Sequence, residues 1–144
     1  MRICTPIRVR YAETDKMGIV YHANYALYLE DARTNFLETV GYPYHLMEEA
    51  GYLSPVVELS IKYGTPFTYG DTVIVRTRVI ENKASKTTYA YEFFRDGMDL
   101  DNDRPLATAQ SSHCIVDSTT FKPCNIKRCL PDLYKLYEGL VEPE

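Results

Sequence analysis

The densest group of reactive side chains lies between Arg10 and Tyr25. This segment reads RYAETDKMGIVYHANY and holds the carboxylates of Glu13 and Asp15, two positions apart, and the imidazole of His22. A positioned aspartate can act as a general base or as a nucleophile on a carbonyl carbon. The segment runs into a predicted helix, whose first backbone N–H groups are unpaired and carry a partial positive charge. Such amides can stabilise the oxyanion of an acyl-transfer reaction.

The same residues also permit a purely structural interpretation. Asp15 could cap a turn, and His22 could be an ordinary residue at the start of a helix. Short polar side chains commonly serve in this way, so residue types alone do not decide between the two interpretations.

One long amphipathic helix is predicted over residues 24–40, directly after this segment. Apolar side chains recur at steps of three and four along one face: Tyr25, Tyr28, Leu29, Ala32, Phe36, Leu37 and Val40. Gly41 and Pro43 predict its end. A helix of this length spans about 25 Å, which is the width of five or six strands spaced about 4.8 Å apart. Shorter helices are predicted over 45–50 and 131–140.

Most of the remaining chain alternates in polarity with the period of two that is typical of strands. Strands are predicted over 6–11, 56–63, 72–80, 87–95 and 106–116, with turn residues between them. The run 106–116 is apolar or small throughout, which predicts a central strand. We therefore expect an α+β fold in one domain, residues 1–144, with one long helix against an antiparallel sheet of five to six strands.

Composition excludes several other classes of protein. The 144 residues carry 16 basic and 20 acidic side chains, a net charge of −4 that argues against broad binding to nucleic acids or anionic membranes. Charges interrupt every stretch long enough to span a bilayer, and the first residues lack the apolar run of a signal peptide, so we expect a cytoplasmic protein. Cys4, Cys114, Cys124 and Cys129 do not form the paired spacing of a zinc site, so we expect reduced thiols and no metal.

The string from Tyr11 to Tyr25 resembles the signature of the hotdog-fold acyl-CoA thioesterases. It is most similar to the 4-hydroxybenzoyl-CoA thioesterase family and its branch associated with the Tol-Pal system. Later landmarks also resemble that family: Tyr63-Gly64-Thr65-Pro66, Gly70-Asp71, Pro105-Leu106-Ala107, Val116-Asp117 and Lys122-Pro123. The resemblance covers the whole chain and implies a hotdog fold, in which a curved antiparallel sheet wraps around one long central helix.

The resemblance also implies roles for particular residues. Asp15 matches the catalytic carboxylate, and His22 matches the position whose backbone N–H polarises the thioester carbonyl; the side chains of His22 and Tyr11 would assist. Glu13 has no implied role. The expected substrate-binding residues are Gly18, Ile19, Val20, Tyr21, Ala23, Tyr25 and Val57, and the expected contacts for the phosphates of coenzyme A are Lys83, Lys86 and Arg95.

In this family the active site lies between two subunits, which implies a homodimer or a dimer of dimers. The implied reaction needs no cofactor, because coenzyme A is part of the substrate and product. Whether the acyl group is carried by coenzyme A or by an acyl carrier protein stays open.

Two other functions remain to be distinguished from hydrolysis. Hotdog dehydratases and hydratases carry a catalytic His and an acid on a different pattern, whereas here Asp15 and His22 are seven positions apart. A non-catalytic acyl-binding protein could also use the same fold.

Overall fold

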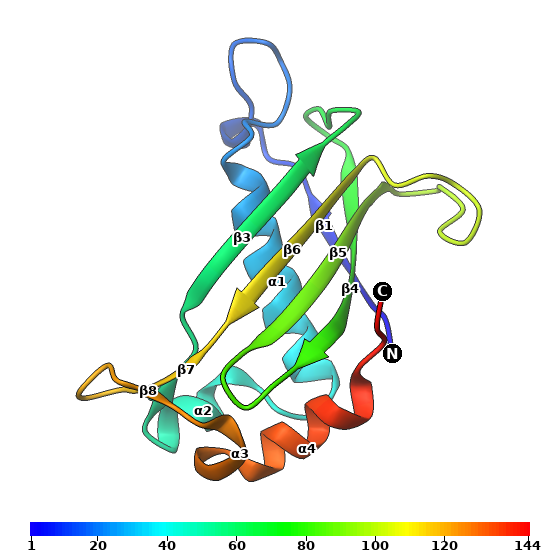
Figure 1. The fold of residues 1–144 in the computed structure, drawn as a ribbon. Helices are drawn as coiled ribbons and strands as arrows, with labels where there is room; N and C mark the ends of the chain where they lie inside the picture. Colours follow the sequence, from blue (N-terminus) through cyan, green and yellow to red (C-terminus); the bar gives the residue numbers. More distant parts are fainter.

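A five-stranded antiparallel sheet lies across one long helix in the computed structural model, which describes all residues 1–144 (Figure 1). The strand order is β1 (Ile3–Arg8), β4 (Thr72–Asn82), β5 (Thr87–Arg95), β6 (Ala107–His113) and β3 (Val56–Tyr63). In this order β1 and β3 form the two edges of the sheet. The helix, α1 (Asn24–Thr39), lies on one face. The predicted hotdog arrangement of one helix against five strands is confirmed.

The smaller elements gather mainly at one end of this sheet. Three short strands form a second sheet: β2 (Tyr52–Leu53), β7 (Ile115–Asp117) and β8 (Pro123–Cys124). The helices α2 (Tyr44–Glu49), α3 (Ile126–Cys129) and α4 (Pro131–Leu140) lie at the same end (Figure 1). A 3-10 helix, η1 (Tyr11–Glu13), and the loop that leads into α1 lie at the opposite end. No helix combines the length and the apolar character needed to cross a bilayer.

The core forms where the apolar stripe of α1 meets the inner face of the sheet. Leu29, Ala32 and Phe36 are fully buried there. Opposite them lie the alternate residues of β4 and β5 that the sequence pattern predicts for one face: Val73, Val75, Thr77, Val79, Tyr89, Tyr91 and Phe93, all at most 2% exposed. Burial of these side chains supplies the main stabilisation and holds α1 in a fixed position on the sheet.

Two predicted strand boundaries are wrong. The first strand covers Ile3–Arg8 rather than 6–11, because the chain turns into η1 after Arg10, whose amide donates to the Glu13 carboxylate (2.8 Å). The predicted strand 106–116 is two strands that separate at Cys114. Up to that point β6 pairs with β5 and β3, whereas β7 pairs with β2 and β8. Polarity alternation does not report a change of partner strand.

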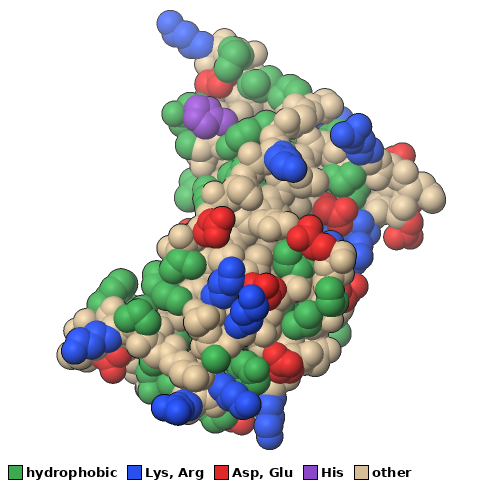
Figure 2. Space-filling model, viewed as in Figure 1, with side chains coloured by type: hydrophobic (Ala, Val, Ile, Leu, Met, Phe, Trp, Pro, Cys, Tyr) green, Lys and Arg blue, Asp and Glu red, His purple; other side chains and the backbone are tan.

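The two faces of the sheet differ in character, and the β3 edge is exposed. Acidic and basic side chains are spread over the outer face, on the side away from α1 (Figure 2). On β3, however, the apolar residues Val56, Val57, Leu59 and Tyr63 are between 43% and 57% exposed. An unpaired strand edge with exposed apolar side chains favours pairing with another chain.

Candidate active site

The loop between η1 and α1 folds back on itself at Asp15. The Asp15 amide donates to the Ile19 carbonyl (2.9 Å), and Gly18, at φ +79°, donates to the Asp15 carbonyl (3.0 Å). Glycine suits this turn because other L-residues rarely adopt a positive φ. One carboxylate oxygen of Asp15, Oδ1, accepts the Met17 amide (2.8 Å), and no group donates to Oδ2. The turn therefore fixes the carboxylate and leaves one oxygen free.

Glu13 anchors this loop to the helix, although the family resemblance implies no role for it. Its buried carboxylate accepts the Tyr28 hydroxyl of α1 (2.9 Å), and its carbonyl accepts the Tyr21 amide (2.9 Å) and the Asn24 side chain (2.9 Å). Burial opposes ionisation, but the hydrogen bonds from the Arg10 amide and Tyr28 outweigh it and hold the pKa of Glu13 below its usual value. Glu13 is a positioning residue that ties both ends of the loop to α1.

The backbone amides at the start of α1 are of two kinds. Three of them are paired: the Tyr21 amide donates to the Glu13 carbonyl, the Asn24 amide to the Tyr21 carbonyl, and the Tyr25 amide to the His22 carbonyl. The amides of His22 and Ala23, in contrast, donate to no other group of the protein. Unpaired amides at a helix start form a partly positive site for an anion.

Tyr63, at the end of β3, joins the sheet to this helix start. Its hydroxyl donates to the His22 carbonyl (2.9 Å), and its ring packs on those of Tyr25 (4.8 Å between centroids) and His22 (6.2 Å). A tyrosine hydroxyl is protonated at neutral pH, and burial raises the pKa of Tyr63 further, so the hydroxyl keeps its hydrogen bond to the His22 carbonyl.

These features open onto one cleft of about 280 Å³. Its lining residues are Asp15, Met17, Ile19, Val20, His22, Tyr25, Tyr63, Gly64 and Pro66. Five of them were predicted as catalytic or substrate-binding residues: Asp15, Ile19, Val20, His22 and Tyr25. The other four, Met17, Tyr63, Gly64 and Pro66, were not predicted as site residues, and the only sequence signal for them was their place in the family motifs.

Other predicted site residues lie outside this cleft. Gly18, Tyr21 and Ala23 are neighbours in the chain that do not line it. The Tyr11 side chain is 76% exposed and packs edge-on against Tyr69, 5.7 Å between ring centroids. Val57 lies six positions before Tyr63 on β3, about 20 Å away along the strand. Within one protomer, therefore, neither Tyr11 nor Val57 reaches the cleft.

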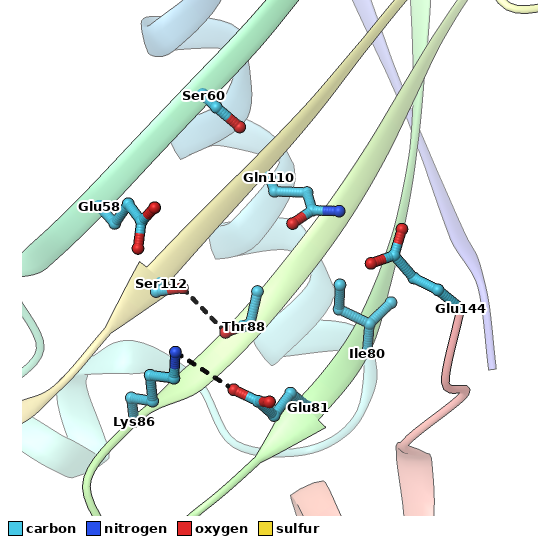
Figure 3. Close-up of a pocket in the computed structure, with 9 residues that line it drawn as sticks. All are labelled: Glu58, Ser60, Ile80, Glu81, Lys86, Thr88, Gln110, Ser112 and Glu144. Atoms are coloured by element: carbon cyan, nitrogen blue, oxygen red, sulfur yellow. Dashed lines mark hydrogen bonds and ion pairs between the residues drawn. The ribbon is translucent and has the colours of Figure 1, made fainter.

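The three predicted coenzyme A contacts do not form one cluster within a protomer. Lys83 and Lys86, in the turn between β4 and β5, both pair with Glu81 (3.3 and 3.4 Å). Figure 3 shows the Lys86–Glu81 pair beside a polar depression on the outer face of the sheet. Arg95 lies at the other end of β5, where it pairs with Asp71 (3.4 Å).

A second cavity, of about 330 Å³, lies beneath the C-terminal half of α1. Its lining residues are Glu30, Arg33, Thr34, Leu37, Tyr44, Met47, Ser54, Tyr89, His113 and Tyr137. A chain of hydrogen bonds runs along it from Arg33 to the Tyr91 hydroxyl (3.3 Å), then to Ser111 (2.7 Å) and His113 Nε2 (2.8 Å). Burial, together with the Arg33 charge, lowers the pKa of His113 to about 3, so its imidazole is neutral at physiological pH.

Comparison with known proteins supports the class that this fold and cleft indicate, the hotdog-fold thioester hydrolases. The family model described as the thioesterase-like superfamily matches residues 9–134, and the chain belongs to this family. Membership of the Tol-Pal branch stays a prediction.

Individual relatives span nearly the same length. The chain is 42% identical over 132 residues to the Bacillus subtilis protein named "Putative acyl-CoA thioesterase YneP", covering 92% of each chain. It is 34% identical over 119 residues to the acyl-CoA thioesterase YbgC of Haemophilus influenzae, covering 82% of this chain and 83% of the relative. A solved structure of a DHNA-CoA thioesterase from Staphylococcus aureus superposes with a TM-score of 0.89 at 34% identity, covering 96% of this chain and 89% of that one.

Proposed function

We propose that the protein hydrolyses acyl-CoA thioesters, with Asp15 as general base or nucleophile and the amides at the start of α1 as the oxyanion hole. One observation carries this proposal: the Asp15 carboxylate, with one free oxygen, lines the same cleft as His22, at a helix start where two successive amides are unpaired. The names of the relatives support coenzyme A as the acyl carrier.

The reaction follows from this arrangement. The amides of His22 and Ala23 donate hydrogen bonds to the carbonyl oxygen as it gains negative charge, and losing one such donor typically costs about 10²–10³-fold in rate. Asp15 either removes a proton from the attacking water or attacks the carbonyl carbon itself, giving an anhydride that water then cleaves. The carbon–sulfur bond breaks in both routes, and the leaving thiolate takes up a proton; we expect the side chain of His22, the histidine that lines the cleft, to supply it.

The complete site needs a second copy of the chain in this proposal. Two β3 edges that pair antiparallel would cover their exposed apolar side chains and place Val57 of one protomer next to the cleft of its partner. The partner's Lys83 and the partner's Lys86 would then lie at the same end of the joined sheet as the cleft, and Arg95 of the cleft's own protomer lies at that end as well. This arrangement keeps all three residues as proposed phosphate contacts, supplied by two chains.

A thiol-release assay separates this function from the two alternatives. We expect the purified protein to release free coenzyme A thiol and the free acid in equal amounts from a panel of acyl-CoAs. Hydration of crotonyl-CoA without thiol release would indicate a hydratase, and saturable binding without turnover would indicate an acyl-binding protein. Either result would contradict the proposal.

A further inference from the structure

We propose that the Arg33–His113 cavity receives the far end of the acyl group of a thioester bound at the partner's cleft, and that it selects acyl groups ending in a carboxylate. The inference rests on the proposed thioesterase function and on the β3 pairing, and it names the substrate class of that shared site.

The register of the β3 pair follows from symmetry and charge. Facing residues of an antiparallel pair project on the same side of the sheet. A two-fold axis perpendicular to the sheet leaves every side chain on the same side of the sheet. Facing residues are therefore an even number of positions apart along β3, so one residue of β3 must face its own copy. The two central residues of Val56–Tyr63 are Leu59 and Ser60.

Centring on Ser60 gives better partners than centring on Leu59. It places Glu58 opposite the partner's Lys62, and Leu59 opposite the partner's Ile61, so that charges of opposite sign and apolar side chains both face each other. Centring on Leu59 would leave Lys62 opposite the partner's Val56. Figure 3 shows Glu58 and Ser60 projecting from β3 on the outer face, where the Glu58–Lys62 pairs would form on both sides of the axis. Opposite charges directly across two strands are stabilising and like charges are destabilising.

This register joins the cleft of one chain to the cavity of the other. Tyr63 and Gly64, which line the cleft, come to lie near the start of the partner's β3, where the ladder shifts between the partner's Val56 and the partner's Glu58. The partner's Ser54, two residues further along, lines the Arg33–His113 cavity. An acyl group whose thioester carbonyl lies at His22 can therefore extend past the end of β3 into that cavity.

The cavity has the chemistry of a carboxylate site with apolar walls. Arg33 is partly buried, its single hydrogen bond goes to a neutral hydroxyl at 3.3 Å, and no carboxylate lies within ion-pair distance of it. The neutral imidazole of His113 and the neighbouring tyrosine hydroxyls add hydrogen-bonding groups, while Leu37 and Met47 line the path for methylene groups. Glu30 is exposed at the rim, one turn before Arg33, and its charge opposes an incoming anion. A guanidinium without an acidic partner binds a carboxylate strongly, often through two parallel hydrogen bonds.

Matched pairs of substrates test this inference. The wild-type protein would be assayed with monothioesters of coenzyme A made from straight-chain dicarboxylic acids of four to ten carbons, and with monocarboxylic acyl-CoAs of equal length. At the best length we expect kcat/KM for the dicarboxylic substrate to exceed that of its partner by at least about tenfold, within the range measured for charge-assisted hydrogen bonds. Arg33→Met should remove this preference, Arg33→Lys should keep part of it, and Glu30→Gln should increase it.

The controls separate a failure of this inference from a failure of the proposed function. Glu38→Gln, an exposed substitution later on α1, should leave the preference unchanged. If Arg33→Met merely disturbed the fold, both substrates would lose rate together and thermal unfolding would shift, while Arg33→Lys and Glu30→Gln would still report the preference. Hydrolysis of both substrate classes at equal rates at every length, unaffected by Arg33, would overturn the carboxylate site and leave the thioesterase intact. Thiol release from neither class would overturn the thioesterase itself.

Discussion

Replacing Asp15 with asparagine should lower kcat for thioester hydrolysis at least about 100-fold, the range expected when a group that acts in the chemical step is lost. The amide has the size of the carboxylate, and its oxygen can still accept the Met17 amide, so the turn should keep its shape. What is lost is the free anionic oxygen that faces the cleft. Rates of thiol release at saturating acyl-CoA measure the effect.

Asp96→Asn provides the matched control for this variant. Asp96 is an exposed aspartate after β5, so the same chemical change there should leave kcat as in the wild type. The melting temperature of both variants should stay close to that of the parent protein. Equal turnover by Asp15→Asn and the wild type would remove Asp15 from the mechanism.

Placing an arginine at Leu59 should convert the protein to monomers and lower its activity together with its assembly. Leu59 is 43% exposed on the β3 edge and lies next to the centre of the proposed pair, opposite the partner's Ile61. Burying an unpaired guanidinium against an apolar partner is costly, so the dissociation constant of the dimer should rise at least about 100-fold. Light scattering at micromolar protein would measure the mass, and thiol release at the same concentration would measure activity.

Leu46→Arg is the corresponding control away from the edge. Leu46 is a leucine of similar exposure, 37%, on α2. We expect this variant to keep both mass and activity. A wild-type protein that scatters as a monomer, or a monomeric Leu59→Arg with full activity, would show that one chain is sufficient for the reaction.

The fold was largely predictable because its main elements bury one face each. The apolar period along 24–40 and the alternation along 72–80 correspond directly to the side chains of α1 and β4 that form the core. The apolar side chains of β3 are an exception, because they are exposed. That strand lies at the edge of the sheet, and alternation in polarity does not distinguish a face buried in the core from a face that awaits a partner chain. The split at Cys114 was missed because it depends on which strands pair.

The candidate site was predictable only where it is local in sequence. Asp15, Ile19, Val20 and His22 come from one short loop, so a single motif brought them together. Tyr63 reaches His22 from 41 positions away, and Glu13 acts through a hydrogen bond from the Tyr28 hydroxyl that no spacing rule reveals. Arg33, Ser54 and His113 meet only after α1 and the sheet have packed, so the second cavity had no signal in the sequence.

The most direct test of the proposed roles of Asp15 and the start of α1 is a crystal structure with an unreactive acyl-CoA analogue in which a ketone replaces the thioester. We expect the ketone oxygen about 3 Å from the amides of His22 and Ala23, as oxyanion donors require, and its carbon within about 3.5 Å of the free Asp15 oxygen or of a water bound to it. A ketone bound elsewhere, with Asp15 pointing away from it, would show that Asp15 and the start of α1 do not form the catalytic site.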